Sequence, residues 1–423
     1  MDFQPVKGTR DFYPDAVRVR NWLFDTWRRV AARNGFEEYD SPIVEYLDLY
    51  TAKSGEGIVS ELFHLTDRGG RDLAIRPETT PALARMVNAR INSLPRPIKW
   101  FCIQRLCRAE KPQRGRSREF FMWNVDVIGA DSTLADAECV FTAVDFLREV
   151  GLGPDDVQVR IGSRPLVIAR LRAAGVAAAR IDAALLALDK RPKVTQDEFE
   201  KLARGAGLTA EQTREICGFL DADPRAALDE MRCDEAMRPH VERVDELLAA
   251  LEAMGAGDYC TPDWHIVRGL AYYTGIVYEA FDAAGSVPRA VAGGGRYDNL
   301  LEALGGPKVG ATGFGMGDVV LGILLDQKGK IPPEATARAL EYFVIDGDAS
   351  RRTAVLETVG RLRRAGLSAD FSYAGRPLGK QLKDADRRGA RRALILFADG
   401  TAAVKDLATG EQHDTTVEAL LDA

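Results

Sequence analysis

Two stretches near residue 110 have the residue pattern of paired strands. Residues 98–108 and 118–128 are rich in β-branched and aromatic side chains, which favour strands. Pro112 and Gly115 interrupt the polar segment between them, as expected for a loop. The pattern therefore predicts an antiparallel hairpin. This region carries six basic side chains: Arg105, Arg108, Lys111, Arg114, Arg116 and Arg118.

A strand pair with so basic a loop suits a polyphosphate or the backbone of a nucleic acid, because guanidinium groups bind phosphate through paired hydrogen bonds. A charged hairpin that is simply exposed to water explains the same residues. The hairpin alone does not decide between these two interpretations.

Other periodic segments predict a mixture of helices and strands. Apolar residues at helical spacing predict a helix over residues 20–34, with Gly35 just past its end. The other elements predicted before residue 330 are strands over 36–46, 73–76 and 157–161, helices over 81–87 and 134–150, and a buried helix over 319–325. Between residues 164 and 255, alanine, leucine and charged residues dominate, which predicts a helical insertion that is long enough to be a small domain of its own.

Strands and helices alternate again at the end of the chain, beyond a proline-containing linker over residues 326–336. The predicted elements there are strands over 341–347, 369–375, 391–399 and 402–407 and helices over 350–365 and 377–388. They indicate an α/β module with a mixed sheet. We therefore expect one domain over residues 1–325 and a second over residues 337–423.

The helix predicted over residues 377–388 has a basic face. Helical spacing places Lys380, Lys383 and Arg387 together, away from the apolar Leu378 and Leu382. Such a face either meets water only or binds an anionic partner.

Composition narrows the class of protein. The chain has 423 residues, a net charge of −6 and 46% hydrophobic residues, so nucleic-acid binding would depend on local basic patches. Its six cysteines and four histidines lack the spacing of a zinc site or a disulfide framework, and we expect no protein-bound metal. We find neither a signal peptide nor an 18-residue apolar run, so the sequence predicts a soluble, cytoplasmic protein.

Residues 264–278 predict a strand that contains an arginine. Alternation would place Arg268 with Leu270 and Tyr272 on one face, and Ala271 with Tyr273 on the other. An arginine within so aromatic a strand needs a carboxylate or a phosphate if it is buried. The residues leave open whether Arg268 forms a structural ion pair or binds a ligand.

Several of these segments resemble motifs of the class II aminoacyl-tRNA synthetases. Arg108-Ala109-Glu110 with Arg116 beyond the loop resembles motif 2, and the helix, glycine and strand that lead to Pro42 resemble motif 1. Residues 267–275 (VRGLAYYTG), 292–306 and 310–318 resemble the histidyl-tRNA synthetases in particular, as does the RPETT phrase at residues 76–80. The tail resembles the anticodon-binding domain of that class. The resemblance implies an antiparallel-sheet catalytic domain, a helical insertion and a C-terminal α/β domain.

The resemblance also implies a reaction and roles for residues. The enzyme would be a homodimer that activates histidine with ATP, accompanied by Mg²⁺, and transfers it to the 3′-terminal adenosine of its tRNA. Arg108, Glu110 and Arg116 would bind ATP, with Arg108 on the α-phosphate. The implied histidine-binding residues are Glu78, Thr80, Asp126, Arg268, Tyr273 and Tyr297, and Arg268 and Arg108 would be catalytic. Arg105, Lys111 and Arg114, in a loop, would meet the acceptor end of the tRNA, and Lys380, Lys383 and Arg387 its anticodon arm.

Three residues depart from the family pattern. Met122 stands where a glutamine is frequent, Asp126 replaces a longer glutamate, and Val320 occupies the place of the motif 3 arginine. Two other functions remain open. The same fold serves as a regulatory subunit of ATP phosphoribosyltransferase, although those subunits lack the C-terminal module. A class II enzyme for proline, threonine or glycine is disfavoured by the phrase at residues 267–275.

Overall fold

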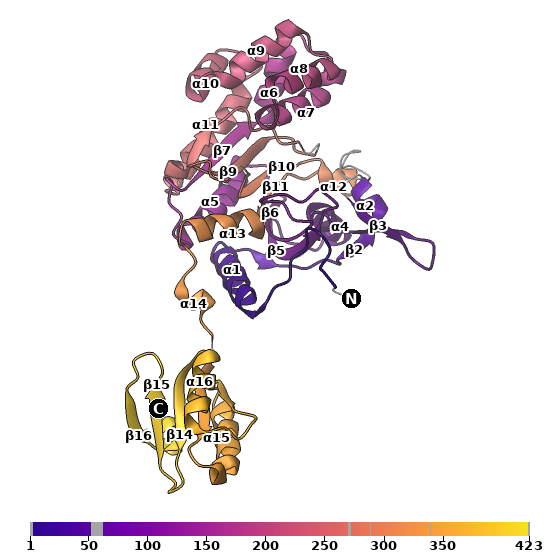
Figure 1. Cartoon of the computed structure of the whole chain (residues 1–423). Helices are drawn as coiled ribbons and strands as arrows, with labels where there is room; N and C mark the ends of the chain where they lie inside the picture. Colours follow the sequence, from indigo (N-terminus) through magenta and orange to yellow (C-terminus); the bar gives the residue numbers. More distant parts are fainter. Residues whose placement is uncertain (1–2, 52–61, 270–271, 288, 339, 422–423) are drawn as a thin grey trace. The chain divides into compact units, whose positions relative to one another are not determined.

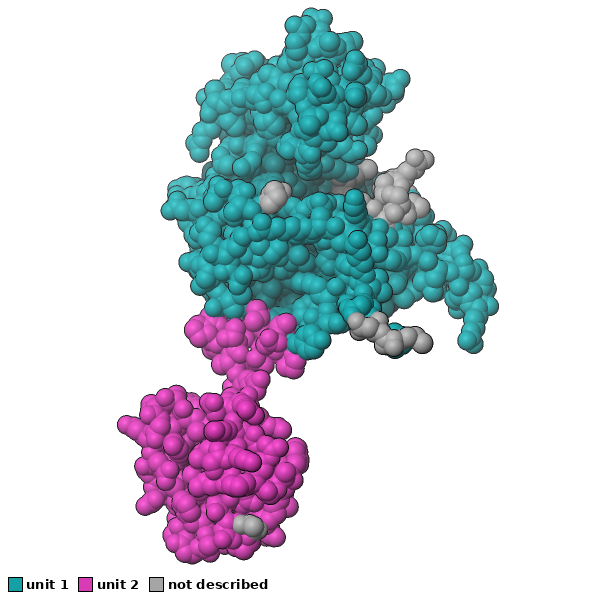
Figure 2. Space-filling model, in the orientation of Figure 1, with its two compact units in different colours: residues 1–13, 20–331 teal, residues 14–19, 332–423 magenta. Residues whose placement is uncertain are grey.

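The computed structural model describes residues 3–51, 62–269, 272–287, 289–338 and 340–421 (Figure 1). They form two compact units, residues 1–13 with 20–331 and residues 14–19 with 332–423 (Figure 2). The boundary between residues 331 and 332 falls within the segment that the sequence predicts as a linker. In the second unit, Arg18 Nε donates a hydrogen bond to the carbonyl of Thr336 at 2.9 Å. No helix of the described chain is long and apolar enough to cross a membrane.

The first unit is built around the predicted hairpin. Strands β5 (Ile98–Cys107) and β6 (Glu119–Ile128) pair antiparallel, with Trp100 opposite Asp126. They belong to an eight-stranded sheet in the order β1-β5-β6-β11-β10-β9-β7-β8, in which only the two outermost pairs are parallel. The other strands are β1 (Glu37–Glu38), β7 (Val157–Ser163), β8 (Cys260–Pro262), β9 (Ile276–Asp282), β10 (Ala292–Arg296) and β11 (Ala311–Gly317). The antiparallel sheet that was predicted is therefore confirmed.

One face of this sheet is covered by helices α1 (Pro14–Arg33), α5 (Thr133–Glu149) and α13 (Asp318–Gln327) (Figure 1). Odd-numbered residues of β6 point to these helices, so that Trp123 stacks on Trp27 of α1 with ring centroids 5.9 Å apart. Even-numbered residues of β6 therefore point to the opposite face. Helix α1 begins earlier than predicted because Pro14 is well suited to the first helical turn. Gly35 follows it with φ 77°, as its predicted position requires.

A second, three-stranded sheet has the order β2-β4-β3, formed by β2 (Val44–Tyr46), β3 (Phe63–Thr66) and β4 (Asp72–Ile75). Helix α2 (Leu47–Thr51) packs against β4 and against helix α4 (Thr80–Arg90). The strand predicted over residues 36–46 is thus two short strands in different sheets. Pro42 lies between them, and proline cannot donate a ladder hydrogen bond.

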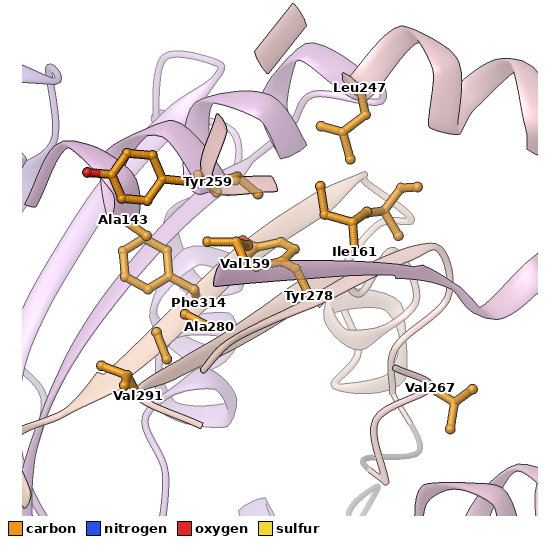
Figure 3. Close-up of a cluster of buried hydrophobic side chains, with 14 of the residues drawn as sticks. Ala143, Val159, Ile161, Leu247, Tyr259, Val267, Tyr278, Ala280, Val291 and Phe314 are labelled. Atoms are coloured by element: carbon orange, nitrogen blue, oxygen red, sulfur yellow. The ribbon is translucent and has the colours of Figure 1, made fainter. Parts of the chain in front are cut away.

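Residues 164–255 are helical, as predicted. The helices are α6 (Arg164–Ala173), α7 (Ile181–Lys190), α8 (Gln196–Gly205), α9 (Ala210–Asp221), α10 (Pro224–Arg232) and α11 (Arg238–Ala253), with 3-10 turns η1 (Ala178–Arg180) and η2 (Arg191–Lys193). A further turn, η3 (Gly257–Tyr259), leads to β8. The insertion shares the core of the large sheet, since Leu247 of α11 and Val159 and Ile161 of β7 belong to one buried cluster (Figure 3). It is part of the first unit and not a separate one.

The strand predicted over residues 264–278 is wrong for most of its length. Strand β9 begins only at Ile276, and the described residues before it, 264–269 and 272–275, form no strand; Arg268 has φ 55°. The predicted alternation fails because Tyr272 and Tyr273 line the same cavity as Arg268. Leu270 and Ala271 lie outside the described residues. The aromatic character of this segment reflects a cavity wall and not a pleated strand.

The second unit contains the predicted mixed sheet, in the order β13-β12-β14-β15-β16. Strand β12 is parallel to β13 and β14, whereas β15 is antiparallel to β14 and β16. The strands are β12 (Leu340–Asp346), β13 (Ala369–Phe371), β14 (Ala390–Leu396), β15 (Ala402–Asp406) and β16 (Gln412–Thr415), and the helices are α14 (Pro333–Thr336), α15 (Arg352–Arg364), α16 (Leu378–Arg387) and α17 (Val417–Leu421). The sequence did not predict β16 and α17.

Candidate active site

A cavity of about 980 Å³ opens over the face of the large sheet that β6 presents with its even-numbered residues. Phe120, Met122, Asn124 and Asp126 line it in that order along the strand. Ten residues predicted as site residues also line it: Glu78, Thr80, Arg108, Glu110, Arg114, Arg116, Asp126, Arg268, Tyr273 and Tyr297. Segments that lie far apart in the sequence thus meet at one cavity.

The strand register orders the site from one end to the other. Asp126 lies opposite Gly313, and Asn124 lies opposite Gly315, which pairs in turn with Gly293 and hence Glu279. Since a strand rises about 3.4 Å per residue, Asp126 and Phe120 are roughly 20 Å apart. The cavity is therefore long enough for two ligands placed end to end.

One end of the cavity is built around Asp126. Its Oδ1 accepts a hydrogen bond of 2.5 Å from the hydroxyl of Tyr297, and both side chains are buried. Burial raises the pKa of Asp126 to about 7, and the hydrogen bond from Tyr297 offsets only part of this effect. The carboxylate approaches the sheet so closely that a Cβ atom at Gly313 would lie 2.1 Å from it. Only glycine fits at that position.

Glu78 and Thr80 follow β4 and begin the turn into α4. The hydroxyl of Tyr272 donates to Glu78 Oε2 at 3.0 Å. Burial raises the pKa of Glu78, and the positive charge of Arg108 opposes this shift. Thr79 occupies the N-cap position of α4 without a capping hydrogen bond from its side chain. A capping hydrogen bond therefore does not explain the presence of Thr79 and Thr80. Thr80 instead lines the cavity.

At this end of the cavity, three buried oxygen atoms have no hydrogen-bond partner among the described residues: Glu78 Oε1, Asn124 Oδ1 and Asp126 Oδ2. Buried acceptors in native proteins are nearly always paired. A ligand that offers several N–H donors would complete this end of the cavity.

Arg268 lies over the middle of the cavity. Its guanidinium forms an ion pair with Glu279 of β9, and it lies 5.6 Å from the ring centroid of Tyr273. Burial is the largest influence and would lower the pKa of Arg268, but the charges and hydrogen bonds of Glu279 and Tyr273 together outweigh it, and the pKa is raised. A Cβ atom at Gly293 would lie 2.5 Å from Arg268 Nη1, so a side chain there would displace the guanidinium from this position.

The unusual backbone at Arg268 is held from the insertion. Arg164, the first residue of α6, is buried and donates through Nη1 to the carbonyls of Val267 (3.0 Å) and Arg268 (2.9 Å). A non-glycine residue with positive φ costs conformational energy and persists only where neighbours fix it. The insertion thus helps to fix the arginine over the cavity.

The other end of the cavity is basic. Arg108 leaves the end of β5, donates from Nε to the carbonyl of Pro77 at 3.0 Å, and has its guanidinium 5.3 Å from the ring of Phe120. Glu110 is buried and forms an ion pair with Arg116, while Arg108 Nη1 lies 3.8 Å from Glu110 Oε1. A single carboxylate therefore lies between two guanidinium groups, and the net positive charge of this end suits an anion.

Some predicted site residues lie elsewhere. Arg105 is in β5 and not in the loop, and it pairs with Glu119 at 3.1 Å beneath the ring of Phe121, on the helix-covered side of the sheet. Lys111 is exposed and does not line the cavity. Lys380, Lys383 and Arg387 are exposed on α16 in the second unit.

The cavity also contains residues that the sequence did not predict as site residues, notably Asn124, Tyr272, Glu279, Arg289 and Lys193. Alternation along β6 places Asn124 on the same face as Asp126, so it could have been found. The others come from loops, from β9 and from the insertion, and their positions depend on long-range folding.

No three His, Cys, Asp or Glu side chains of the described chain converge to hold a metal ion. The Mg²⁺ ion that the resemblance implies would therefore be held by phosphate oxygens and water, as this ion prefers.

Comparisons with known proteins agree with this geometry. The family described as "Histidyl-tRNA synthetase" matches residues 8–317, and the "Anticodon binding domain" matches residues 343–423. The "Histidine--tRNA ligase" of Opitutus terrae is 41% identical over 98% of this chain and 96% of its own length. That of Halobacterium salinarum is 37% identical over 99% of this chain and 96% of its own length.

Among solved structures, the histidyl-tRNA synthetase of Nostoc sp. PCC 7120 matches with a TM-score of 0.82 and 25% identity, and the match covers 100% of this chain and 98% of that chain. The family match spans most of the first unit, including the hairpin and the residues of the cavity. The chain belongs to the histidyl-tRNA synthetase family.

Proposed function

We propose that this protein is a histidine–tRNA ligase, and that the cavity on the large sheet carries out both steps of its reaction. In the first step a carboxylate oxygen of histidine attacks the α-phosphorus of ATP, and the bond to pyrophosphate breaks. In the second step the 3′-terminal adenosine of the tRNA attacks the histidyl carbonyl through a ribose hydroxyl, and AMP leaves.

The observation that carries this proposal is the match between the unpaired acceptors and histidine. Glu78, Asn124 and Asp126 offer three buried oxygen atoms without partners among the described residues. Histidine presents an ammonium group and an imidazole, whose N–H donors would pair with these oxygens. In this arrangement Asp126, with Tyr297 and Tyr273, contacts the imidazole, and Glu78 with Thr80 contacts the ammonium group.

Arg268 would then lie between the substrate carboxylate and the α-phosphate. Arg268 lies over Gly293, which is in the same cross-strand row as Asn124. That row is two residues, or roughly 7 Å, from the row of Asp126, toward the basic end. Arg108 would bind the α-phosphate, and Glu110 and Arg116 would bind the rest of ATP. Positioning and charge stabilisation suffice for this displacement, so no nucleophilic side chain is needed.

The test is pyrophosphate exchange into ATP, measured with each of the twenty amino acids. We expect exchange with histidine alone. Histidine binding without exchange would contradict the proposal and favour a non-catalytic relative. A regulatory subunit of ATP phosphoribosyltransferase is disfavoured, because the match to the anticodon-binding domain and the full-length ligase relatives both support an enzyme.

We further propose how the protein meets its tRNA. Arg114 lines the basic end of the cavity and Lys111 is exposed on the same loop, so both are suited to the acceptor end. Arg105 stays a weaker candidate because Glu119 already pairs with it. Lys380, Lys383 and Arg387 present three exposed charges on α16 and are suited to the anticodon arm.

We also propose that the protein is a homodimer. The small sheet has an exposed apolar face, with Tyr46 57% and Leu65 45% exposed, and both lie opposite Leu73 in the strand register. A second copy of the chain would cover this face in a two-fold arrangement. The cytoplasmic location stays a prediction from the sequence.

A further inference from the structure

Val320 lies at the basic end of the cavity, in the first turns of α13. Its apolar side chain offers no hydrogen bond to a phosphate at the place where the resemblance implies an arginine. The outer phosphates of ATP carry most of its charge. Arg116, which is already paired with Glu110, would be left to bind them.

A second arginine lies beside Val320 in space, although it is far from it in sequence. A methyl group at position 115 would be 3.1 Å from Arg289 Cδ and 3.5 Å from Val320 Cγ2, so both side chains border one point next to the motif 2 loop. Arg289 lines the cavity and is half-buried. No hydrogen bond or ion pair of its guanidinium with another described residue is found.

The loop that carries Arg289 is well fixed at both ends. The carboxylate of Asp282 accepts hydrogen bonds from the backbone N–H and the hydroxyl of Ser286, both at 2.6 Å, and from the N–H of Val287 at 3.0 Å. The N–H of Val291 pairs with the carbonyl of Ala280 at 2.7 Å, and both valines are buried. These hydrogen bonds fix the chain at Val287 and at Val291, on either side of Arg289, before a ligand arrives.

Charge favours an anion beside Arg289. Burial and the charge of Arg116 both lower the pKa of Arg289, while the charge of Glu110 acts in the opposite direction. Arg108 stands at the same end of the cavity. Three guanidinium groups thus surround one carboxylate, and a polyphosphate would relieve their repulsion.

We propose that Arg289 binds the outer phosphates of ATP and the departing pyrophosphate, and that it supplies from the β9–β10 loop the guanidinium that α13 lacks at Val320. This inference rests on the proposed function. Its test is built so that it does not depend on histidine activation.

The first measurement is equilibrium binding of ATP and of AMP by calorimetry, with Arg289→Ala, Arg289→Gln and the exposed Arg172→Ala as a matched control. Loss of one charged hydrogen-bonding partner should weaken ATP binding on the order of 10- to 100-fold, with AMP binding unchanged, because AMP has no outer phosphates. Arg172→Ala should bind both as the unmodified protein does.

Retained AMP binding also reports that each variant is folded. Unchanged ATP binding by Arg289→Ala, or an equal loss of AMP binding, would overturn the proposal. If the unmodified protein binds ATP but shows no histidine-dependent exchange, the proposed function fails while this test still decides the role of Arg289.

The second measurement tests whether Arg289 and an arginine at position 320 bind the same phosphates. In pyrophosphate exchange, Arg289→Ala should raise the KM for ATP and for pyrophosphate but leave the KM for histidine unchanged. Adding Val320→Arg to Arg289→Ala should recover part of the lost ATP affinity. A double variant that binds AMP normally but binds ATP no better than Arg289→Ala would contradict the proposal that Arg289 replaces an arginine at position 320.

Discussion

Arg268 forms a structural ion pair and also lines the cavity. The sequence left open an ion pair or a ligand site, and the guanidinium both pairs with Glu279 and lines the cavity. Arg164 fixes its backbone by donating to its carbonyl, and Gly293 leaves the space that its guanidinium occupies. Such fixed donors stabilise developing charge without reorganising during the reaction.

Replacing Arg268 by alanine should therefore reduce histidine-dependent exchange by about 100- to 1000-fold, the effect of removing one preorganised donor to a transition state. Arg268→Lys should recover little, because an ammonium group cannot reproduce the planar guanidinium that contacts two partners. Steady-state exchange rates with circular dichroism as a folding control will check this. A lysine variant with near-normal turnover would show that the arginine is only structural.

Asp126 should make stability depend on pH. Its pKa in the folded protein is about 7, above the ordinary value near 3.8, so ionisation of the buried group opposes folding as pH rises between these values. Asp126→Asn removes that ionisation. The variant should gain stability relative to the unmodified protein between pH 4.5 and 7.5, on the order of 2–4 kcal/mol.

Denaturant unfolding at these two pH values measures the effect. The exposed Asp155→Asn is the control for replacing a carboxylate by an amide at the surface. An Asp126→Asn difference that is the same at both pH values would mean that the carboxyl group is not neutral at low pH in the folded protein.

At the scale of elements, the helix α16 confirms one pattern fully. Lys380, Lys383 and Arg387 are exposed, while Ala385 is buried and Leu378 is half-buried, as helical spacing predicted. If this face binds the anticodon arm, Lys380→Glu or Lys383→Glu should weaken aminoacylation and flatten its salt dependence. Pyrophosphate exchange should change little, since that step needs no tRNA.

The matched control is Arg364→Glu, which reverses an exposed charge on α15 of the same unit. Filter binding of tRNA at several salt concentrations, alongside both activity assays, separates the outcomes. Equal losses of tRNA binding in the α15 and α16 variants would indicate a general effect of charge. A loss of pyrophosphate exchange in the α16 variants would mean that α16 has a different role.

Local patterns predicted well the elements that local interactions determine. The hairpin, α5 and the mixed sheet of the second unit follow from periodicity and from glycine and proline positions. The segment before Ile276 was mistaken for a strand because its aromatic residues line a cavity, and sequence spacing cannot distinguish a cavity wall from a pleat. The same limit applies to Arg289, whose neighbour Val320 follows it only after two strands and a helix.

Arg105 shows the reverse case. Its basic neighbours suggested a loop, but strand register places it opposite Phe121, on the face that packs against α1. One residue of register changes the face that a side chain occupies. A charge count over a hairpin therefore overestimates the number of charges that reach a ligand.

For the molecule as a whole, the two units divide the proposed reaction. The residues proposed to bind histidine and ATP all lie in the first unit, whereas the basic face of α16 lies in the second. The insertion belongs with the first unit and reaches the cavity through Pro192 and Lys193. Amino-acid activation should therefore depend on the first unit, and tRNA affinity on both.

The small sheet predicts how copies of the chain associate. Tyr46, Leu73 and Leu65 form a cross-strand row, and neighbouring Val44 pairs with Ile75, so one face is apolar across three strands. The opposite face buries Ala74 within the first unit. An exposed apolar face of this kind marks an interaction surface. A two-fold dimer would cover it with the same face of the second copy.

We expect light scattering at micromolar concentration to give twice the chain mass of 46.3 kDa. Leu65→Glu should give the mass of one chain, because the interface would then bury an unpaired charge on each copy. His64→Glu is the matched control, since His64 lies one residue away on the other face of β3 and is exposed. It should remain dimeric. A monomeric unmodified protein, or a dimer that survives Leu65→Glu, would mean that this face is not the interface.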